Sequence, residues 1–381
     1  MKLMHIVENL DKGAVENWLV NVFLESRKTR PDWEWTFYCI VGKPGRLDEK
    51  VRAAGGKIIY SEVTVSKKIK FLQQLRKTLI QGQFDIIHAH HDYLSGFYLL
   101  ASAGLTFKRR ILHIHNNDKG IPVGNRTLYK VLLPIFRWLG LKLSDVVLGI
   151  SNHTLNDFKM KYSSGKPEFE VLYYGIDLTP YAIQPDRDSV RTALNLPAGS
   201  KILLFTGRMI EEKNPVYLIR ILHALLLHRN DVFAVFAGKG PLEDAVVSLA
   251  SEYKIKDHVR MLGWSDKIAV LMKSSDVFVF PRLETPKEGL GLVVVEAQAA
   301  GLPTFITEGI VKDAVIIPEI VFYQELKNLD QWVEDINYIL DRGPAISNET
   351  ALSRMKDSTF ELGNATNNLI HFYERKFISL N

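Results

Sequence analysis

Cysteine is nearly absent from this sequence of 381 residues: Cys39 is the one cysteine, so the chain cannot form an internal disulfide. That composition fits a reducing compartment. No uncharged apolar run approaches the ~20 residues that a membrane-spanning helix needs. The first residues, MKLMHIVENLDKG, have too short an apolar core for a signal peptide. We therefore predict a cytoplasmic protein.

Repeats and low-complexity segments are also lacking, and 46% hydrophobic with 24% charged residues is an ordinary globular composition. The length suggests two or three domains. Positive charge is uneven: residues 1–183 hold 26 Lys and Arg against 17 Asp and Glu, and the remainder holds 22 against 26. A basic first half suggests an anionic surface or substrate. Because no nucleic-acid-binding module accompanies the charge, we expect no nucleic-acid partner.

Apolar strand-like runs alternate with helical patterns along the chain, which predicts parallel sheets wound on both faces. In the first half, strands are expected at 2–7, 35–42, 57–62, 84–91, 108–115, 146–151 and 170–175. In the second half they are expected at 201–207, 232–238, 259–263, 276–281 and 303–307. The polar, proline-containing segment 177–200 between the two series is expected to be an interdomain linker. The fold class is therefore α/β, with two doubly wound Rossmann-like domains at 1–183 and 184–361.

One stretch of the second half, 281–303, carries two glutamates with seven residues between them, Glu288 and Glu296. Glycines follow the first glutamate and open a segment, 292–300, with the length and composition of a helix. A helix start after a buried strand offers backbone N–H groups and a positive dipole end to a phosphate or a sugar hydroxyl. About two helical turns separate the two carboxylates, so both can reach one cleft.

This stretch resembles the Glu-x7-Glu motif of retaining glycosyltransferases of the GT-B fold, family 4, and EAQAAGLP looks most like bacterial enzymes of exopolysaccharide or capsule assembly. The resemblance implies two domains facing an interdomain cleft, with an acceptor-side domain at 1–183 and a nucleotide-sugar-binding domain at 184–361. It also implies that the final helix, within 362–381, crosses back onto the first domain. Under it, Glu296 holds the ribose of a nucleotide sugar and Glu288 positions the sugar.

A second motif, Gly207-Arg208 followed by Lys213, resembles the G-R-x3-E-K motif of the same family. Two cations there can hold the diphosphate of the donor, Arg208 as a fork and Lys213 as a point charge. Further donor contacts that the resemblance implies come from backbone groups of Gly13, Ala14, Gly207, Leu262, Gly289, Leu290, Gly291 and Leu292. Ala14 stands where the family motif has its second glycine, and Tyr174 and Arg282 replace a common asparagine and serine.

Histidines form two alternating patterns near the expected strand ends. His115, followed by an asparagine, resembles the histidine that this family places beside the reacting sugar, so it joins Glu288, Arg208 and Lys213 as a catalytic candidate. His88, His90 and Asp92 alternate onto one face and offer a rival interpretation, because such clusters bind metal in several hydrolases. We predict no metal and no cofactor for the transferase, since two cations already face the diphosphate.

Two basic amphipathic segments, 66–79 and 125–143, fit two interpretations: contact with an anionic membrane, or packing on the protein's own sheet. The sequence as a whole predicts a retaining, metal-independent hexosyl- or N-acetylhexosaminyltransferase. It would use a UDP-sugar and an acceptor hydroxyl on a polysaccharide or lipid-linked precursor, at the inner face of the membrane. The alternatives are the metal-dependent hydrolase, and a sugar-nucleotide epimerase or binding protein of the same fold.

Overall fold

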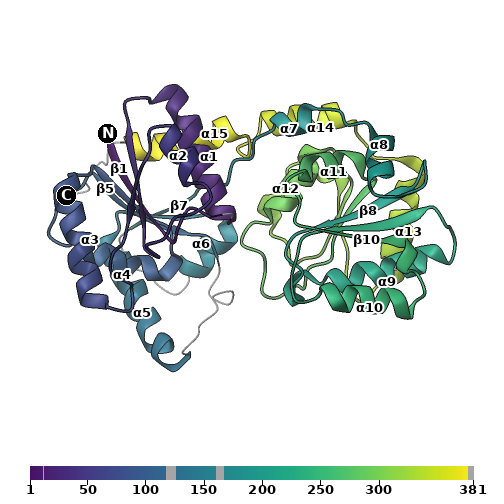
Figure 1. The fold of residues 1–381 in the computed structure, drawn as a ribbon, viewed down its shortest axis with the longest axis horizontal. Coiled ribbons are helices and arrows are strands. Elements are labelled where there is room, and N and C mark those ends of the chain that lie inside the picture. The colour runs from purple at the N-terminus through teal and green to yellow at the C-terminus, as the bar shows by residue number, and fades with distance from the viewer. Residues whose placement is uncertain (12, 117–125, 160–166, 376–381) are drawn as a thin grey trace. The chain divides into compact units, whose positions relative to one another are not determined.

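Two separate parallel sheets organise the chain (Figure 1). The computed structural model describes residues 1–11, 13–116, 126–159 and 167–375; the side chains of 126–131 and 157 also lie outside the description. Residues 1–176 and the C-terminal segment from Leu362 form the N-terminal unit, and Asp177–Glu361 form the C-terminal unit. The predicted α/β class with two Rossmann-like domains is confirmed.

The sheet of the N-terminal unit has the order β3-β2-β1-β4-β5-β6-β7 among the described residues, with every pairing parallel. Its strands are β1 (Lys2–Val7), β2 (Glu34–Cys39), β3 (Lys57–Tyr60), β4 (Ile86–Ala89), β5 (Arg109–Ile114), β6 (Val146–Gly149) and β7 (Glu168–Val171). Such strands are covered on both faces, so they are apolar almost without interruption. The sequence order reverses between β1 and β4, the place where ligands bind in sheets of this kind.

Helices cover both faces of this sheet (Figure 1). They are α1 (Ala14–Thr29), α2 (Asp48–Ala53), α3 (Lys68–Gly82), α4 (Ser95–Leu99), α5 (Arg126–Leu143), α6 (Asn152–Lys159) and α15 (Leu362–Glu374), with short 3-10 turns at Asp92–Leu94 and Leu100–Ser102. Amphipathic spacing decides which side of a helix faces the sheet: α1 buries Trp18, Leu19, Val22 and Phe23.

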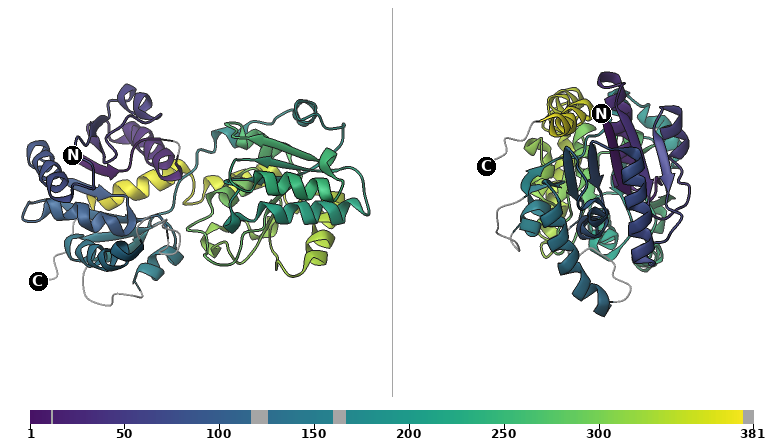
Figure 2. Two further views of the ribbon diagram at one scale, coloured as in Figure 1. Left: turned by 60° about the horizontal axis from the view of Figure 1, so that its bottom comes forward. Right: turned by 90° about the vertical axis from the view of Figure 1, so that its left-hand side faces the viewer.

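The C-terminal helix α15 packs beside α1 in the N-terminal unit, as both views of the yellow and purple helices show (Figure 2). The Leu362 amide donates to the Ile176 carbonyl at 3.1 Å, so the chain re-enters the unit at the point where it left. An Arg30–Glu374 ion pair with an N–O distance of 2.6 Å ties the ends of the two helices together. Tyr373 is buried against the sheet and contacts His88.

The sheet of the C-terminal unit has the order β10-β9-β8-β11-β12-β13 in the described chain, again all parallel. Its strands are β8 (Lys201–Thr206), β9 (Val232–Ala237), β10 (Val259–Gly263), β11 (Val277–Phe280), β12 (Thr304–Ile306) and β13 (Val321–Tyr323). Its helices are α7 (Thr179–Ala182), α8 (Arg187–Ala193), α9 (Pro215–Leu226), α10 (Glu243–Glu252), α11 (Ile268–Ser274), α12 (Leu292–Ala299), α13 (Leu329–Arg342) and α14 (Asn348–Lys356).

The segment 177–200, which the sequence predicts as an interdomain linker, forms α7 and α8 and packs on α11 within the C-terminal unit. Lys273 of α11 donates to the Tyr181 carbonyl at 2.7 Å, and Arg191 of α8 pairs with Asp276 at 3.1 Å. The proline and polar residues of this segment fit its two helices, because α7 and α8 are short and expose much of their surface. Proline at the start of α7 fits the first turn of a helix.

The helices in the described parts of the chain do not combine the length and hydropathy that crossing a bilayer requires. On α3, Phe71, Leu75 and Leu79 face the core, whereas Ile69 is 75% exposed. On α5, Arg137 is buried with its guanidinium 4.1 Å from the centre of the Tyr93 ring, so this residue is not a surface cation.

Candidate active site

Loops after two neighbouring strands carry most of the predicted donor site. Strands β8 and β11 pair directly, and the sequence order of the sheet reverses between them. The loop after β8 contains Gly207, Arg208 and Lys213, and the loop after β11 contains Arg282 and Glu288. At such a reversal the two loops leave in opposite directions and open a crevice at the carboxyl edge of the sheet. The fold therefore brings together residues about 70 positions apart.

Close backbone packing shapes the loop after β8. Gly207 has a φ of +134°, and its N–H donates to the Ala237 carbonyl at 3.0 Å. A Cβ on Gly238 would lie 1.9 Å from the Gly207 oxygen, and one on Gly240 would lie 2.4 Å from the Met209 oxygen. The Gly-x-Gly pattern after β9 is thus required by the loop that carries Arg208, whose side chain is exposed.

Lys213 ends a short 3-10 turn, Glu211–Lys213, and is partly buried. Its Nζ lies 5.3 Å from the centre of the Phe280 ring at the end of β11. Burial lowers the pKa of this ammonium; the Glu288 carboxylate opposes that effect, the Arg208 and Arg282 guanidinium groups add to it, and Glu296 opposes it weakly. The pKa of Lys213 therefore responds to the charged groups of both loops and to Glu296.

Glu288 is held by a residue that the sequence analysis did not assign to the site. Arg282 is buried, its Nη1 lies 2.9 Å from Oε2 of Glu288, and its Nη2 donates to the Pro286 carbonyl at 2.7 Å. The Glu288 amide donates to the Gly309 carbonyl at 2.8 Å. Glu284, another glutamate of the stretch 281–303, is exposed. The sequence shows one sign of this ion pair, which is the arginine at position 282 where the family commonly has serine. A buried cation needs a carboxylate partner.

The start of α12 presents the amides of the predicted glycine segment. Gly291 is the N-terminal cap with a φ of +85°, Leu290 is buried and Leu292 begins the helix. Gly289 is partly buried just before them. The first turn of a helix leaves N–H groups without partners inside the helix, and its dipole end favours an anion or an oxygen ligand.

Glu296 lies one turn into α12 and is partly buried. Desolvation raises the pKa of its carboxyl group to about 7, and Lys213 partly opposes the shift. Tyr181 of α7 lies within electrostatic reach: burial, then Glu296, raise the pKa of its hydroxyl well above 10. Leu262, predicted to contact the base, is partly buried on β10, and the neighbouring Trp264 is 70% exposed.

The remaining predicted residues belong to the N-terminal unit. Gly13 caps α1 and Ala14 is its exposed first residue. A Cβ on Gly13 would lie 1.8 Å from an Oε atom of Glu16, so glycine leaves room for that carboxylate. Burial raises the pKa of Glu16.

His115 follows β5 and is buried. Its Nδ1 contacts the Tyr174 hydroxyl, and its Nε2 lies 3.2 Å from Nδ1 of His90. Tyr174 also stacks on Trp18 with ring centres 4.7 Å apart. The departure from asparagine at Tyr174 therefore has a structural consequence, since this hydroxyl orients the histidine. Burial lowers the pKa of His115 well below 6.5, which keeps the ring neutral near pH 7.

The proposed metal set of His88, His90 and Asp92 is not formed. Oδ1 of Asp92 accepts from the amides of His115, at 2.5 Å, and Asn116, at 3.1 Å, and Oδ2 accepts from the Asn116 side chain at 3.2 Å. The carboxylate thus caps the end of β5 instead of joining the two histidines.

A separate hollow of about 270 Å³ in the C-terminal unit is lined by Arg187, Lys201, Asp276 and Asn348 among others. None of the predicted donor residues lines it. Arg187 and Lys201 already pair with Asp276, and Lys273 donates to the Tyr181 carbonyl.

Comparisons with known proteins agree with the fold and the motifs. The family described as glycosyl transferases group 1 matches residues 186–353, and the one described as Glycosyltransferase Family 4 matches residues 32–180. EpsF of Bacillus subtilis is 28% identical over 81% of this chain and 79% of its own length. The UDP-Gal:alpha-D-GlcNAc-diphosphoundecaprenol alpha-1,3-galactosyltransferase of Escherichia coli is 24% identical over 77% of this chain and 76% of its own.

Among solved structures, Anabaena HepE in complex with UDP is similar with a TM-score of 0.79 and 16% identity, covering 98% of this chain and 99% of that one. That likeness concerns the fold. Together with the two family matches, the order of the motifs and the two parallel sheets, it leads to one assignment: the chain belongs to the GT-B glycosyltransferases of the family 4 type.

Proposed function

We propose that this glycosyltransferase moves a hexosyl or N-acetylhexosaminyl group from a UDP-sugar, with retention of configuration, to a hydroxyl of a polysaccharide or lipid-linked oligosaccharide precursor. The observation that carries the proposal is the convergence of Arg208, Lys213, Glu288 and Glu296 at the β8–β11 edge. The choice of UDP is supported by the E. coli relative, named for UDP-Gal and a lipid diphosphate, and by the UDP bound to HepE.

Arg208 and Lys213 would bind the diphosphate. Negative charge grows on this leaving group as its bond to the sugar breaks, and preorganised cations stabilise charge that develops in the transition state. Arg208, on the exposed part of the loop, can approach as a bidentate donor, whereas Lys213 is already held near Phe280. We expect the reaction to need no metal ion at the diphosphate, because these two cations supply the charge.

Glu296 would accept hydrogen bonds from the ribose hydroxyls. Glu288, held by Arg282, would position the donor sugar together with the amides of Gly289 to Leu292. The ion pair with Arg282 limits the rotation of the Glu288 carboxylate, which suits a positioning role better than a nucleophilic one.

The N-terminal unit would supply His115 and the amides of Gly13 and Ala14. His115 is neutral and bonded to Tyr174 through Nδ1, so its Nε2 would exchange its contact with His90 for a hydroxyl of the sugar rather than act as a strong base. An oxygen of the departing diphosphate would accept the proton of the acceptor hydroxyl, on the face of the sugar from which the diphosphate departs. Because the acceptor hydroxyl attacks on that same face, the configuration of the sugar is retained. The metal-dependent hydrolase is not favoured, because the Asp92 carboxylate is engaged elsewhere and the family matches are to transferases.

The stereochemical outcome can be tested without knowing the acceptor. The slow hydrolysis of an α-linked UDP-sugar should release the α-anomer first, observed by proton NMR before mutarotation. UDP-glucose should also raise the melting temperature more than GDP-glucose or ADP-glucose, in buffer with chelator as well as with Mg²⁺. Initial release of the β-anomer would exclude retention. Tight binding with neither hydrolysis nor transfer to a membrane extract would favour a binding protein, and a new UDP-sugar formed without acceptor would favour an epimerase.

Lys213→Ala should lower kcat about 10²–10³-fold, the usual effect of removing one group that stabilises transition-state charge. The melting temperature should change little, because the buried ammonium contributes a desolvation cost as well as an attraction. Lys327→Ala, at an exposed surface lysine, is the matched control and should leave kcat unchanged. Equal turnover in the Lys213 variant and the wild type would remove this residue from the site.

Donor affinity should depend on pH through Glu296. Its pKa of about 7 is raised, so below pH 7 the carboxyl is protonated and loses an acceptor site for the ribose. KM for UDP-glucose, whose diphosphate does not titrate in this range, should be about tenfold higher at pH 6 than at pH 8, the ratio set by one proton with that pKa. Glu296→Gln should raise KM at pH 8 and remove the dependence. A variant with the same pH profile as the wild type would show that another group titrates.

We also propose peripheral contact with anionic lipid through α3, where the exposed Ile69 stands in the sequence between the exposed lysines Lys68 and Lys70. Basic side chains contribute about 1 kcal/mol each near an anionic surface. Wild-type protein should co-sediment with phosphatidylglycerol vesicles and not with phosphatidylcholine vesicles. Ile69→Glu should reduce that binding at least tenfold, and Ile183→Glu, at an exposed isoleucine of the C-terminal unit, should not. Equal binding by both variants would locate the contact elsewhere.

A further inference from the structure

Five histidines gather on one face of the N-terminal sheet, and the proposed transfer reaction uses only one of them. His5 lies on β1, His88 on β4 with His90 directly after it, and His113 on β5 with His115 directly after it. All five are buried, with at most 6% of their surface exposed. The register of the sheet pairs His5 with His88, so the rings of neighbouring strands stand side by side.

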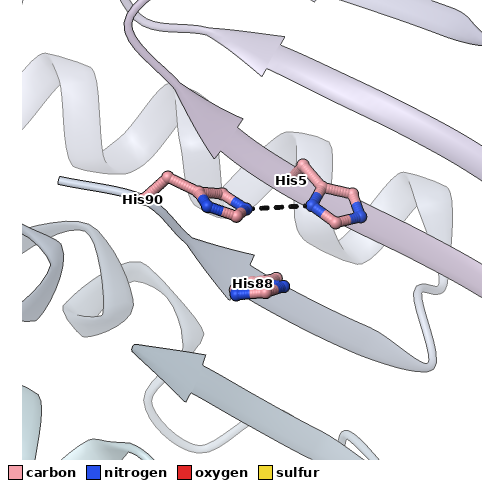
Figure 3. A group of neighbouring side chains, drawn as sticks. All are labelled: His5, His88 and His90. Atoms are coloured by element: carbon pink, nitrogen blue, oxygen red, sulfur yellow. Dashed lines mark hydrogen bonds between the residues drawn. The ribbon is translucent and has the colours of Figure 1, made fainter. Parts of the chain in front are cut away.

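His5, His88 and His90 point toward one another (Figure 3). Nδ1 of His5 lies 3.0 Å from Nε2 of His90, and the centres of the His88 and His90 rings are 4.1 Å apart. One ring nitrogen from each of the three lies within 4.8 Å of the others. Imidazole nitrogens bound to zinc at about 2.0–2.1 Å in a tetrahedron are about 3.3 Å apart, so small side-chain shifts would complete such a site.

Outer partners hold these rings in place. The Tyr373 hydroxyl lies 2.8 Å from Nδ1 of His88, and Trp35 stacks on His5 with ring centres 4.6 Å apart and planes within 3°. A metal-binding histidine commonly uses its second nitrogen to bond an outer group, which fixes the tautomer and the ring orientation. The Tyr373 contact fits that role, since it leaves Nε2 of His88, now 3.2 Å from Nδ1 of His113, to bind the ion.

Hydrogen bonds among the rings do not satisfy all of their nitrogens. Nε2 of His5 and Nε2 of His113 are buried without a hydrogen-bond partner in the part of the chain that the structure describes. Leaving a buried polar atom unpaired is unfavourable, and a cluster that ends in such atoms is incomplete as a hydrogen-bond network. Of these two atoms, Nε2 of His5 belongs to a residue of the trio, and an ion bound through it would give it a partner.

We propose that His5, His88 and His90 bind one divalent transition-metal ion of the zinc class, as a structural centre that ties β1 to β4. Three neutral imidazoles suit Zn²⁺, Co²⁺, Ni²⁺ and Cu²⁺, whereas Mg²⁺ and Ca²⁺ prefer oxygen ligands. The strands joined are those between which the sheet order reverses, so the ion stabilises the N-terminal unit at its centre.

This centre differs from the metal set suggested by sequence spacing, because His5 takes the place of Asp92. All three side chains are buried, so the ion would lie inside the N-terminal unit, with a water molecule as the fourth ligand of a tetrahedral site. The ion is therefore structural, and the diphosphate-binding cations of the C-terminal unit act independently of it. A second trio, His90, His113 and His115, has a similar spacing, but the proposed transfer reaction already uses its His115, so we assign the ion to the first trio.

The test uses full-length protein without a polyhistidine tag, unfolded in chelator and refolded with or without Co²⁺. Wild-type protein should bind one Co²⁺ per chain with the intense visible absorption of a tetrahedral site, and Zn²⁺ should displace it. Refolding with the ion should raise the melting temperature of the wild type. A refolded wild type with no bound ion and no change in melting temperature would overturn the proposal.

Three variants identify the ligands. His5→Phe keeps a ring against Trp35 and should weaken Co²⁺ binding more than ~100-fold, while Tyr373→Phe, which removes an outer partner, should weaken it about 10–100-fold. His228→Phe, at an exposed histidine, is the control and should bind as the wild type does. Wild-type affinity in His5→Phe together with loss of binding in His115→Ala would show that the second trio holds the ion and that our assignment is wrong. Thermal shift with UDP-glucose should give the same result for His5→Phe and wild type, which shows that the variant is folded.

Discussion

Desolvation of charge at the β8–β11 edge is the constraint on which the proposed donor site depends. Lys213, Arg282 and Glu296 are each removed from water, and each keeps an opposite charge within reach. The shifted pKa values of Lys213 and Glu296 show that these partners do not fully compensate for lost hydration. A diphosphate beside Lys213 and ribose hydroxyls beside Glu296 would supply the missing interactions, as the proposed function requires.

Most of the fold could be predicted from local sequence patterns. The run KLMHIV predicted β1, KILLFT predicted β8, and glycine before an apolar helix predicted the start of α12, because these signals depend only on burial and on the conformations open to nearby residues. The two glutamates and the Arg208–Lys213 pair could also be found, since spacing in the chain fixes their place after strands. Their roles toward a donor stay proposals.

Features that depend on distant contacts were missed. Arg282 could be noticed in the sequence only because it replaces a common serine. Its pairing with Glu288 could not be predicted, because the path of the loop after β11 brings the two side chains together. The histidine cluster was seen in part: His5 and His90 are 85 residues apart, and only the register of β1 on β4 brings them together. The short edge strand β13 was not predicted, since three residues give too weak a pattern.

The most direct test of the central claim is a crystal structure of the protein with UDP bound. The account predicts ribose hydroxyls on the Glu296 carboxylate and phosphate oxygens within hydrogen-bond distance of Arg208 and Lys213, at the carboxyl ends of β8 and β11. A nucleotide bound elsewhere, with these three side chains making no contact to it, would contradict the account.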